Sequence, residues 1–219
     1  VSGKNCLLMV SDFNEISGSA LKLMGLKATK SEIDMYRQYL ILLGKWNQVY
    51  NITSIAPKAK WVSAHLYDSC SIISILPSGT LLDIGTGGGF PGLPIAITQP
   101  EREVVLLDRS AKKTTFLKQV TIELGLKNVT IETSRIESYD PAKRFDVIVS
   151  RAFSELKTFL RKASRLCSQD GTLIAMKGKY PEAELAIIPK ERIKKVRNLR
   201  VPQLNAERHV VELAPDLQI

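Results

Sequence analysis

The sequence predicts a doubly wound α/β fold, with a mostly parallel sheet and a helical segment in front of it. From Thr80 onward, short apolar runs alternate with stretches of helical periodicity. Such alternation is typical of parallel strands joined by right-handed helical crossovers. Five glycines lie within the eight residues from Gly85 to Gly92, directly after the first apolar run, where doubly wound sheets bind their ligands. The 219 residues, 44% of them hydrophobic, are enough for one sizeable core.

The part of the chain before the sheet is predicted to be helical. The first thirty residues show no sustained period. A helix is predicted to begin at Ser31, which caps an acidic first turn. Apolar side chains follow at helical spacing, namely Ile33, Tyr36, Leu40 and Leu43. A second helix over Ala59–Leu76 is ended by a Pro-Ser-Gly turn signal. We therefore expect residues 1–78 to form a helical extension packed on a domain of residues 79–219.

The rest of the chain is predicted to supply the sheet and its crossover helices. The apolar runs predict strands over Thr80–Ile84, Glu103–Leu107, Val129–Glu132, Phe145–Val149 and Thr172–Met176. The helical stretches between them lie near Gly92–Thr98, Lys112–Leu124 and Leu156–Cys167. Two further segments, Lys194–Pro202 and Arg208–Leu213, are predicted to close the sheet as an antiparallel pair. We therefore expect seven strands, most of them parallel.

Composition narrows the class of protein. The net charge is +9, and residues 150–219 carry 14 basic against 8 acidic side chains, which favours a polyanionic partner such as nucleic acid. No apolar run approaches the ~20 residues of a membrane-spanning helix. The three cysteines include no C-x-x-C pair, which is typical of a reduced protein without a disulfide framework or a zinc site. We therefore expect a cytoplasmic protein that binds neither a membrane nor a metal.

The glycine loop "LLDIGTGGGFPGLP" (Leu81–Pro94) fits two classes of ligand. From Gly87 it matches G-x-G-x-x-G, the dinucleotide fingerprint. Asp83 argues against a dinucleotide because its carboxylate would repel a pyrophosphate, and two prolines in the first helical turn remove N–H groups that a phosphate would use. An acidic seat favours a ligand with a positively charged amino-acid end, such as S-adenosylmethionine. The predicted cofactor contacts in this loop are Asp83, Gly85, Gly87 and Gly89.

Positions after the second and third strands fit a ligand that contains a nucleoside. Asp108 ends the run "VVLLD" and is placed to accept hydrogen bonds from both ribose hydroxyls, a role that NAD and S-adenosylmethionine share. Ile136 is predicted to pack on the adenine ring, and Glu137 to bond its edge.

S-adenosylmethionine donates a methyl group, and motifs that this sequence lacks narrow the choice of the atom that accepts it. Methylation at pyrimidine C5 needs a cysteine nucleophile, but Cys6 and Cys70 precede the sheet and Cys167 is predicted in mid-helix. Exocyclic amines usually use an Asn/Asp-Pro-Pro-aromatic turn after the fourth strand, where this chain has "VIVSRAFSEL". Oxygen acceptors often need a base or a metal, and no metal-ligand cluster is visible in the sequence. A ring nitrogen such as guanine N7 carries no proton and needs no base, so it is weakly favoured.

Six segments resemble a known family. They are "GKWNQVYNITSI", "HLYDSCSI", "LLDIGTGGGFPGLPIAI", "SRAFSEL", "MKGKYPEAEL" and "ERHVVEL". In this order and spacing they resemble the RsmG family, also called glucose-inhibited division protein B, over about residues 35–215. The resemblance implies a Rossmann-like class I S-adenosylmethionine-dependent methyltransferase fold. It also implies a cytoplasmic bacterial enzyme that methylates N7 of one guanine in a 16S ribosomal RNA loop near the decoding site.

The resemblance also assigns residues by position. Gly85 and Phe90 match the family's cofactor contacts in the glycine loop, and Ile136 and Glu137 match its pair on the adenine side. Arg151, in "SRAF", matches the arginine at the mouth of the site, where its guanidinium would hold the cofactor carboxylate, an RNA phosphate or a base. Because N7 methylation requires no general base, Arg151 is expected to position the reactants.

Basic residues in the C-terminal third are candidates for RNA contact. Lys177 and Lys179 follow the fifth strand, at the edge expected to carry the site. Lys194, Lys195 and Arg197 belong to a run of six basic residues between positions 190 and 200. The alternative for these lysines and arginines is a solvated basic surface.

Two other functions stay open at this point. One is a methyltransferase that acts on another RNA position or on a small molecule. The other is an RNA-binding ribosome-assembly factor with a vestigial cofactor pocket. The RNA partner is either 16S ribosomal RNA or a small-subunit assembly particle. Asn51, His65 and Asp68 belong to the family pattern as well, and no chemistry is predicted for them.

Overall fold

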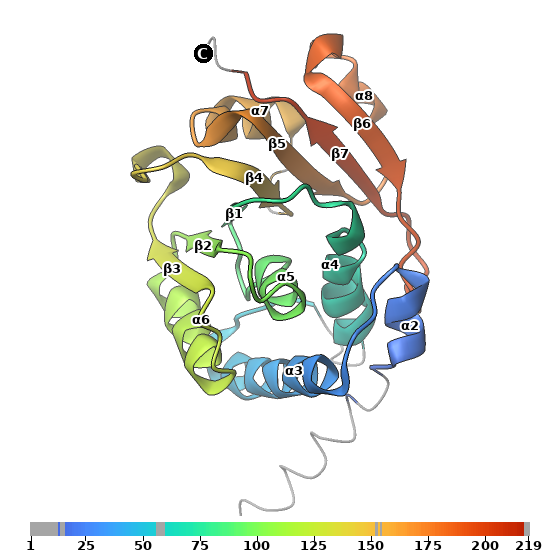
Figure 1. Ribbon diagram of the computed structural model, residues 1–219, viewed down its shortest axis with the longest axis vertical. Helices are drawn as coiled ribbons and strands as arrows, with labels where there is room; N and C mark the ends of the chain where they lie inside the picture. Colours follow the sequence, from blue (N-terminus) through green and yellow to red (C-terminus); the bar gives the residue numbers. More distant parts are fainter. Residues whose placement is uncertain (1–12, 14–15, 56–59, 152, 154, 217–219) are drawn as a thin grey trace, which may run out of the picture.

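A seven-stranded sheet forms the centre of the protein. The computed structural model describes residues 13, 16–55, 60–151, 153 and 155–216. The strands are β1 (Leu81–Ile84), β2 (Val104–Asp108), β3 (Val129–Thr133), β4 (Phe145–Ser150), β5 (Cys167–Lys177), β6 (Ile193–Asn198) and β7 (His209–Leu213). Their order is β3-β2-β1-β4-β5-β7-β6 (Figure 1), and among the described strands the pairs of β7 with β5 and β6 are antiparallel while all other pairs are parallel. The predicted α/β fold with a mostly parallel sheet is confirmed.

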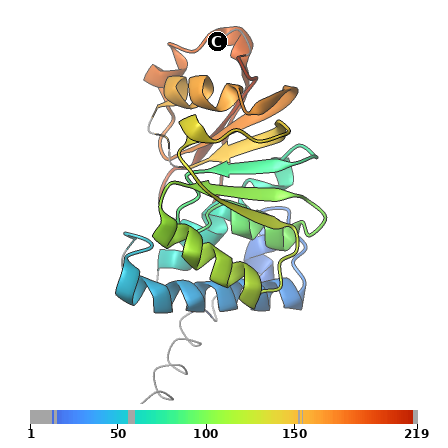
Figure 2. The same ribbon diagram turned by 90° about the vertical axis from the view of Figure 1, so that its left-hand side faces the viewer.

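Helices cover both faces of this sheet. They are α2 (Gly18–Leu23), α3 (Lys30–Tyr50), η2 (Val62–Tyr67), α4 (Asp68–Cys70), η3 (Ile73–Ile75), α5 (Gly92–Thr98), α6 (Ala111–Glu123), η4 (Ile136–Ser138), α7 (Leu156–Ser164), α8 (Glu182–Leu185) and η5 (Lys190–Arg192). Helices α3, α5 and α6 pack together on one face, and α7 packs on the other. Figure 2 shows α3 running across the base of the molecule beneath α6.

The sheet separates two hydrophobic clusters because alternate residues of a strand point to opposite faces. Leu81 packs in the cluster that contains α3, α5 and α6, whereas Leu82 packs in the cluster that contains α7. Asp83 therefore points to the same face as Leu81. Its carboxylate accepts a hydrogen bond from the backbone N–H of Gly92, the first residue of α5. The strand period thus places this acidic group under the start of a helix.

Helix α3 begins at a different cap from the one predicted. The N-cap is Thr29 rather than Ser31, and it forms a capping box with Glu32. The Thr29 hydroxyl accepts from the Glu32 N–H at 3.2 Å, and the Glu32 carboxylate accepts from the Thr29 N–H at 2.6 Å. Two reciprocal hydrogen bonds satisfy two orphan donors of the helix start, which a lone serine cap would not do.

The helix predicted over Ala59–Leu76 consists of three short segments. Ala59 lies outside the described residues. The first described segment, η2, is a π-helix in which the Asp68 N–H donates to the Ser63 carbonyl, five residues back. Residues 61–70 are buried without exception, so this segment lacks the polar face of a surface helix. π-Helical turns are frequent at functional sites, and this one carries His65.

Two other predicted boundaries are wrong. The helix predicted to reach Cys167 ends at Ser164, and Cys167 instead begins β5, where it is paired with Phe145 of β4. Helical periodicity does not reveal this long-range pairing. The strand predicted over Lys194–Pro202 ends at Asn198, ahead of a turn with positive φ at residue 203.

The N-terminal extension packs into the main core as far as the structure describes it. Residues 1–12 and 14–15 of the predicted extension lie outside the described residues. Helix α2, capped by Ser17, lies where the sequence shows no sustained period. Its buried residues share one hydrophobic cluster with α3, β1, α5 and α6. We keep the division of the chain after residue 78 as a proposal. Among the described residues, no helix combines the length and the apolar character that crossing a bilayer requires.

Candidate active site

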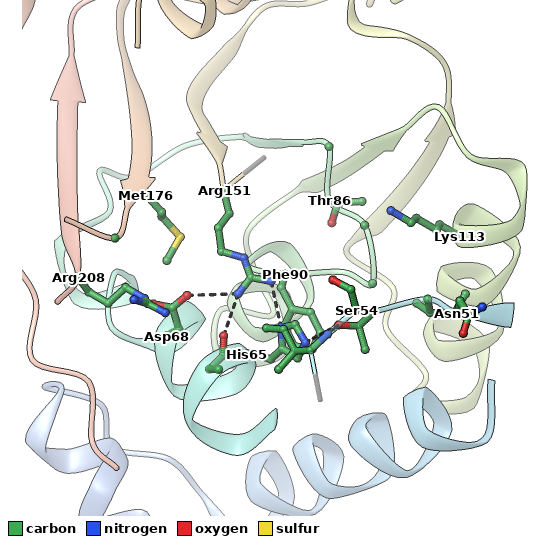
Figure 3. Close-up of a pocket in the computed structure, with 18 of the residues that line it drawn as sticks. Asn51, Ser54, His65, Asp68, Thr86, Phe90, Lys113, Arg151, Met176 and Arg208 are labelled. Carbon is green, nitrogen blue, oxygen red and sulfur yellow. Dashed lines mark hydrogen bonds and ion pairs between the residues drawn. The ribbon is translucent and has the colours of Figure 1, made fainter. Parts of the chain in front are cut away.

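Two cavities meet at the carboxyl edge of the sheet. The first has a volume of about 580 Å³ and is lined by residues that follow β1, β4 and β5, together with residues 51–55 and η2 (Figure 3). The second has a volume of about 450 Å³ and is lined by residues that follow β2 and β3. Gly85 and Lys113 line both cavities. The strand order reverses between β1 and β4, so the cavities occupy the place where doubly wound sheets bind ligands.

The glycine loop requires glycine at several positions for different reasons. Gly85, Gly87 and Gly89 have φ angles of 69°, 62° and 100°, which side chains of L-residues rarely adopt. Gly85 and Gly87 line the first cavity, as expected for backbone that a ligand approaches. A Cβ atom on Gly89 would lie 2.8 Å from the Tyr39 hydroxyl and 2.9 Å from Leu117. Gly89 therefore permits helix packing and, among the described residues, lines neither cavity.

Asp83 lies beneath the loop instead of on the cavity wall. Its side chain is 0% exposed, and its Oδ2 accepts hydrogen bonds from the Thr86 hydroxyl at 2.7 Å and the Gly92 N–H at 2.8 Å. Burial raises the pKa of this carboxyl to about 6. Its Oδ1 is buried and has no hydrogen-bond partner among the described residues. Asp83 thus shapes the loop with one oxygen and leaves the other as a free acceptor, and its contact with a cofactor stays a prediction.

Asp108 connects the end of β2 to the glycine loop. Its Oδ2 accepts from the Gly87 N–H and its Oδ1 from the Ser110 N–H, both at 2.9 Å. These bonds orient the carboxylate at the wall of the second cavity. Each carboxylate oxygen has a second lone pair, so Asp108 retains acceptor capacity for a diol.

The far wall of the second cavity carries the predicted adenine-side pair. Ile136 is buried and presents an apolar surface to this cavity. Glu137 is exposed and forms an ion pair with Lys162 at 2.5 Å, and this hydrogen bond lowers the pKa of the Glu137 carboxyl. The structure therefore brings Asp108, Ile136 and Glu137 to one cavity, as an adenosine site requires.

Three planar groups, Phe90, His65 and Arg151, meet at the first cavity (Figure 3). The Phe90 and His65 rings are 4.5 Å apart at an interplanar angle of 9°. The Arg151 guanidinium carbon lies 5.5 Å from the centre of the Phe90 ring. Arg151 also donates hydrogen bonds to His65 Nδ1 at 3.1 Å and to the Ala64 carbonyl at 3.2 Å. The predicted loop residue Phe90 and the predicted mouth residue Arg151 therefore meet in one assembly.

His65 is held as a neutral ring. Burial, reinforced by the positive charge of Arg151, lowers its pKa to about 3. Because Arg151 donates to Nδ1, the proton of the neutral ring resides on Nε2, which donates to the Thr53 hydroxyl at 2.8 Å. Both ring nitrogens are engaged, and this histidine is not available as a proton acceptor.

Asp68 joins two arginines that are far apart in the sequence, Arg151 directly after β4 and Arg208 directly before β7. Its Oδ2 accepts from Arg151 at 3.2 Å and its Oδ1 from Arg208 Nε at 2.8 Å. Asp68 is almost fully buried, whereas the two arginines line the first cavity. Removing one partner of a buried pair leaves the other charge uncompensated, which is strongly destabilising. Asp68 therefore fixes both guanidinium groups against the cavity wall.

The cations predicted to contact RNA are dispersed. Lys177 lines the first cavity, but its ammonium is paired with the Glu184 carboxylate at 2.8 Å and is largely buried. Lys179 is exposed and follows the cavity residue Gly178.

The remaining predicted cations lie on β6, the strand at the outer edge of the sheet. Lys194 donates to the Gly171 carbonyl and the Thr172 hydroxyl, and Arg197 is paired with Glu212 at 2.5 Å. Lys195 is exposed. The structure does not bring Lys194, Lys195 or Arg197 to either cavity, and charged side chains also protect an edge strand from unwanted pairing.

The sequence and fold of the chain match known methyltransferases. A family model described as "GidB: rRNA small subunit methyltransferase G" matches residues 32–211. The chain belongs to the GidB family. It is 47% identical to the ribosomal RNA small subunit methyltransferase G of Chromobacterium violaceum over 192 residues, covering 87% of this chain and 92% of that protein. For the same protein of Nitrosococcus oceani the identity is 45% over 196 residues, with 89% and 92% covered.

Solved structures resemble this GidB protein in fold. Pyrococcus horikoshii TYW2 in complex with MeSAdo has a TM-score of 0.56 at 13% identity, covering 75% of this chain and 65% of that one. Thermus thermophilus TrmN has a TM-score of 0.54 at 17% identity, covering 78% and 52%. Both likenesses support the class I methyltransferase fold.

Membership of the GidB family makes S-adenosylmethionine the methyl donor, and the two cavities fit it. The second cavity offers a diol acceptor at Asp108 and an apolar wall at Ile136. The unpartnered Oδ1 of Asp83 lies beneath the glycine loop and, in the part of the chain that the structure describes, on the wall of neither cavity, and it is a buried acceptor of the kind that an ammonium satisfies. Among the described residues, no group of three or more His, Cys, Asp or Glu side chains is arranged to hold a metal ion.

Sequence reasoning missed two residues of this GidB site. Arg208 lies in the segment "ERHVVEL", which carried the family resemblance, but nothing in the sequence shows its partner Asp68 140 residues away. Lys113 lines both cavities without any motif that singles it out. His65 and Asp68 belong to the family pattern, but the sequence did not predict what they do, because their roles depend on contacts with Arg151.

Proposed function

We propose that this enzyme transfers the methyl group of S-adenosylmethionine to N7 of a guanine in 16S ribosomal RNA. Membership of the GidB family supports a ribosomal RNA substrate. The choice of N7 rests on one observation, the state of the groups around the first cavity. Both ring nitrogens of His65 are engaged, so this ring has no free lone pair, and the carboxylate of Asp68 is committed to two guanidinium cations, Arg151 and Arg208. Guanine N7 has a lone pair and no proton, so it is the acceptor that such a site suits.

The residues of the chain then act by binding and orientation. S-adenosylmethionine, when bound, supplies an electrophilic methyl group on its sulfonium. Asp108 and Ile136 hold its nucleoside end in the second cavity, and Gly85 and Gly87 let the remainder cross the loop in contact with the backbone. Arg151 positions the acceptor, since its guanidinium is fixed over Phe90 by Asp68 and His65. Holding both reactants in line accounts for catalysis of this kind.

Methyl transfer with mapping of the product tests the proposal. The enzyme is incubated with labelled S-adenosylmethionine and 16S ribosomal RNA from bacteria that lack this methylation. We expect the label at N7 of a single guanine, detected by cleavage of the chain at the methylated base. Label on an exocyclic amine, a pyrimidine carbon or a ribose would overturn the assignment to N7. Absence of S-adenosylmethionine binding in calorimetry would favour an assembly factor instead.

The proposal extends to where the enzyme meets its substrate. We place the reaction in the bacterial cytoplasm, either on 16S ribosomal RNA or on a small-subunit assembly particle. Parallel assays with free 16S RNA, assembling particles and mature subunits distinguish these substrates. Lys179 is the predicted cation best placed to contact the RNA, because it is exposed and adjacent to the cavity residue Gly178.

A further inference from the structure

Two exposed aromatic side chains flank the first cavity along the chain. Six large hydrophobic residues are strongly exposed among the described residues, namely Leu23, Val49, Tyr50, Ile122, Tyr180 and Ile187. The only aromatic ones in this set are Tyr50, at 44% exposure, and Tyr180, at 54%. Tyr50 directly precedes the cavity residue Asn51, and Tyr180 comes two residues after the cavity residue Gly178.

The cavity residues next to the two tyrosines in the sequence come from opposite sides of this cavity. Figure 3 shows Asn51 at one side, at the end of α3, and Met176 at the other, near the end of β5. Tyr50 is the last residue of α3, and Tyr180 belongs to the loop that follows β5. A guanine that enters the cavity between these two sides would have its neighbours in the RNA chain directed toward them.

Each exposed ring is braced by a second ring. Tyr50 packs against Trp46 with ring centres 5.1 Å apart. Tyr180 packs edge-on against His209 with centres 5.5 Å apart, and His209 is itself bonded to the Gly178 carbonyl at 2.9 Å. Bracing limits the motion of each ring while a large part of its surface stays in contact with water. An exposed ring with restricted motion loses little entropy when a planar ligand stacks on it.

When a base leaves its stack to enter an active site, the neighbouring bases lose a stacking partner that aromatic side chains can replace. A guanine methylated inside a cavity of about 580 Å³ has left its stack, and its two neighbours have each lost a stacking partner. Proteins that bind single-stranded RNA supply aromatic side chains to unstacked bases, with cations beside them for the phosphates. Here Lys179 adjoins Tyr180, and its side chain has no ion pair with any residue that the structure describes.

We propose that Tyr50 and Tyr180 stack on the bases of the two nucleotides that flank the target guanine. This inference rests on the proposed ribosomal RNA substrate and specifies how that RNA is held. Stacking depends on the ring and not on the hydroxyl, so phenylalanine replaces either tyrosine. Alanine at either position weakens RNA binding at least about fivefold, from the usual contribution of one base stacked on an aromatic ring.

Binding of an RNA fragment that contains the target loop tests this inference. Affinity is measured at fixed salt for the parent and for Tyr50→Ala, Tyr50→Phe, Tyr180→Ala and Tyr180→Phe. Ile187→Ala is the matched control, because Ile187 is also a large, exposed hydrophobic residue but is not aromatic. We expect the phenylalanine variants and the control to bind like the parent, and the alanine variants to bind at least about fivefold more weakly. The affinity for S-adenosylmethionine, measured by calorimetry, stays unchanged and shows that the variants are folded.

A second readout identifies stacking directly. The fluorescent base 2-aminopurine is placed at each nucleotide next to the target guanine. We expect its fluorescence to be quenched when the parent binds and to recover with the alanine variant of the tyrosine on that side. Alanine variants that bind as well as Ile187→Ala overturn the inference, as do phenylalanine variants that lose as much affinity as alanine. Methyl transfer by the parent tests the proposed function separately, and RNA affinity decides the stacking roles whatever position receives the label.

Discussion

Replacing Asp83 by asparagine tests two effects of its buried charge separately, the loss of folding stability and the gain in affinity for S-adenosylmethionine. Asp83 is fully buried, and one of its oxygens already holds Thr86 and Gly92. An asparagine keeps that acceptor, because its amide oxygen can take the same two hydrogen bonds. The NH2 group of the asparagine then occupies the position of the unpartnered Oδ1 of the parent. We expect Asp83→Asn to fold, to bind RNA like the parent at the same salt, and to lose affinity for S-adenosylmethionine.

The magnitude of the stability effect follows from the pKa of Asp83. Burial raises this pKa from 3.8 to about 6. A carboxyl whose pKa is raised on folding stabilises the folded state below pH 3.8, and this contribution is lost as the pH rises through 6. The total loss is about 3 kcal/mol by pH 8, at ~1.4 kcal/mol per unit of pKa. About half of it, ~1.5 kcal/mol, falls between pH 5 and pH 8.

Urea unfolding without cofactor measures this effect. The stability of Asp83→Asn relative to the parent is expected to improve by ~1.5 kcal/mol between pH 5 and pH 8, because the amide does not titrate. Asp146→Asn is the matched control, because hydrogen bonds from Thr80 lower the pKa of Asp146 below its ordinary 3.8. The stabilising contribution of this carboxylate is therefore complete well above pH 3.8, and the difference between Asp146→Asn and the parent should stay constant from pH 5 to pH 8. A difference between Asp83→Asn and the parent that does not change with pH would refute the argument from burial.

Calorimetry decides whether the free oxygen of Asp83 serves the cofactor. A charge-assisted hydrogen bond to an ammonium contributes about 1.5–3 kcal/mol. The loss in Asp83→Asn should therefore be at least about tenfold in the Kd of S-adenosylmethionine. An unchanged Kd would mean that Asp83 only shapes the loop.

Four further single substitutions have expected outcomes. Gly89→Ala should destabilise the fold by about 3 kcal/mol in urea unfolding, because its Cβ collides with Tyr39 and Leu117 at a φ of 100°. Gly87→Ala, whose Cβ meets nothing closer than 3.8 Å, should cost only about 1 kcal/mol. Asp68→Asn should lower kcat/KM roughly 10- to 100-fold with an unchanged circular dichroism spectrum, because both arginines lose their charged partner and one of them also loses its acceptor. For His65→Asn, stability relative to the parent should improve as the pH falls below 6.5, because the parent folds only with this ring neutral. A constant difference across that range would contradict the neutral ring.

The positions of most strands along the chain were predictable because each strand carries its own signal. Buried parallel strands are short apolar runs, and the runs at β1, β2 and β4 are almost continuously buried. The boundary at Cys167 was not predictable, since the pairing with Phe145 that makes it a strand residue is a tertiary contact. The π-helical turn at η2 has no periodic signature either. Because every residue of this turn is buried, apolar and polar positions do not alternate with a helical period.

The cofactor side of the site was more predictable than the acceptor side. The glycines, Asp108 and the Ile136–Glu137 pair lie directly after strands, where the topology places ligand contacts. The acceptor side depends on contacts between segments far apart in the sequence, such as Asp68 with Arg208. Asp83 is the exception on the cofactor side. Its position before the loop was evident, but its burial depends on which face of β1 it occupies.

The charges around the first cavity favour RNA over a neutral small molecule as the acceptor. Four basic side chains line this cavity, two of them share the buried carboxylate of Asp68, and a third, Lys177, is paired with Glu184, so positive charge remains in excess. The sulfonium of the donor adds one positive charge, and methyl transfer to a guanine N7 would pass that charge to the base while the sulfur becomes neutral. A neutral small molecule would leave this excess uncompensated in a partly closed site. An RNA phosphate at the mouth neutralises it, so RNA binding supplies the charge balance that the side chains lack.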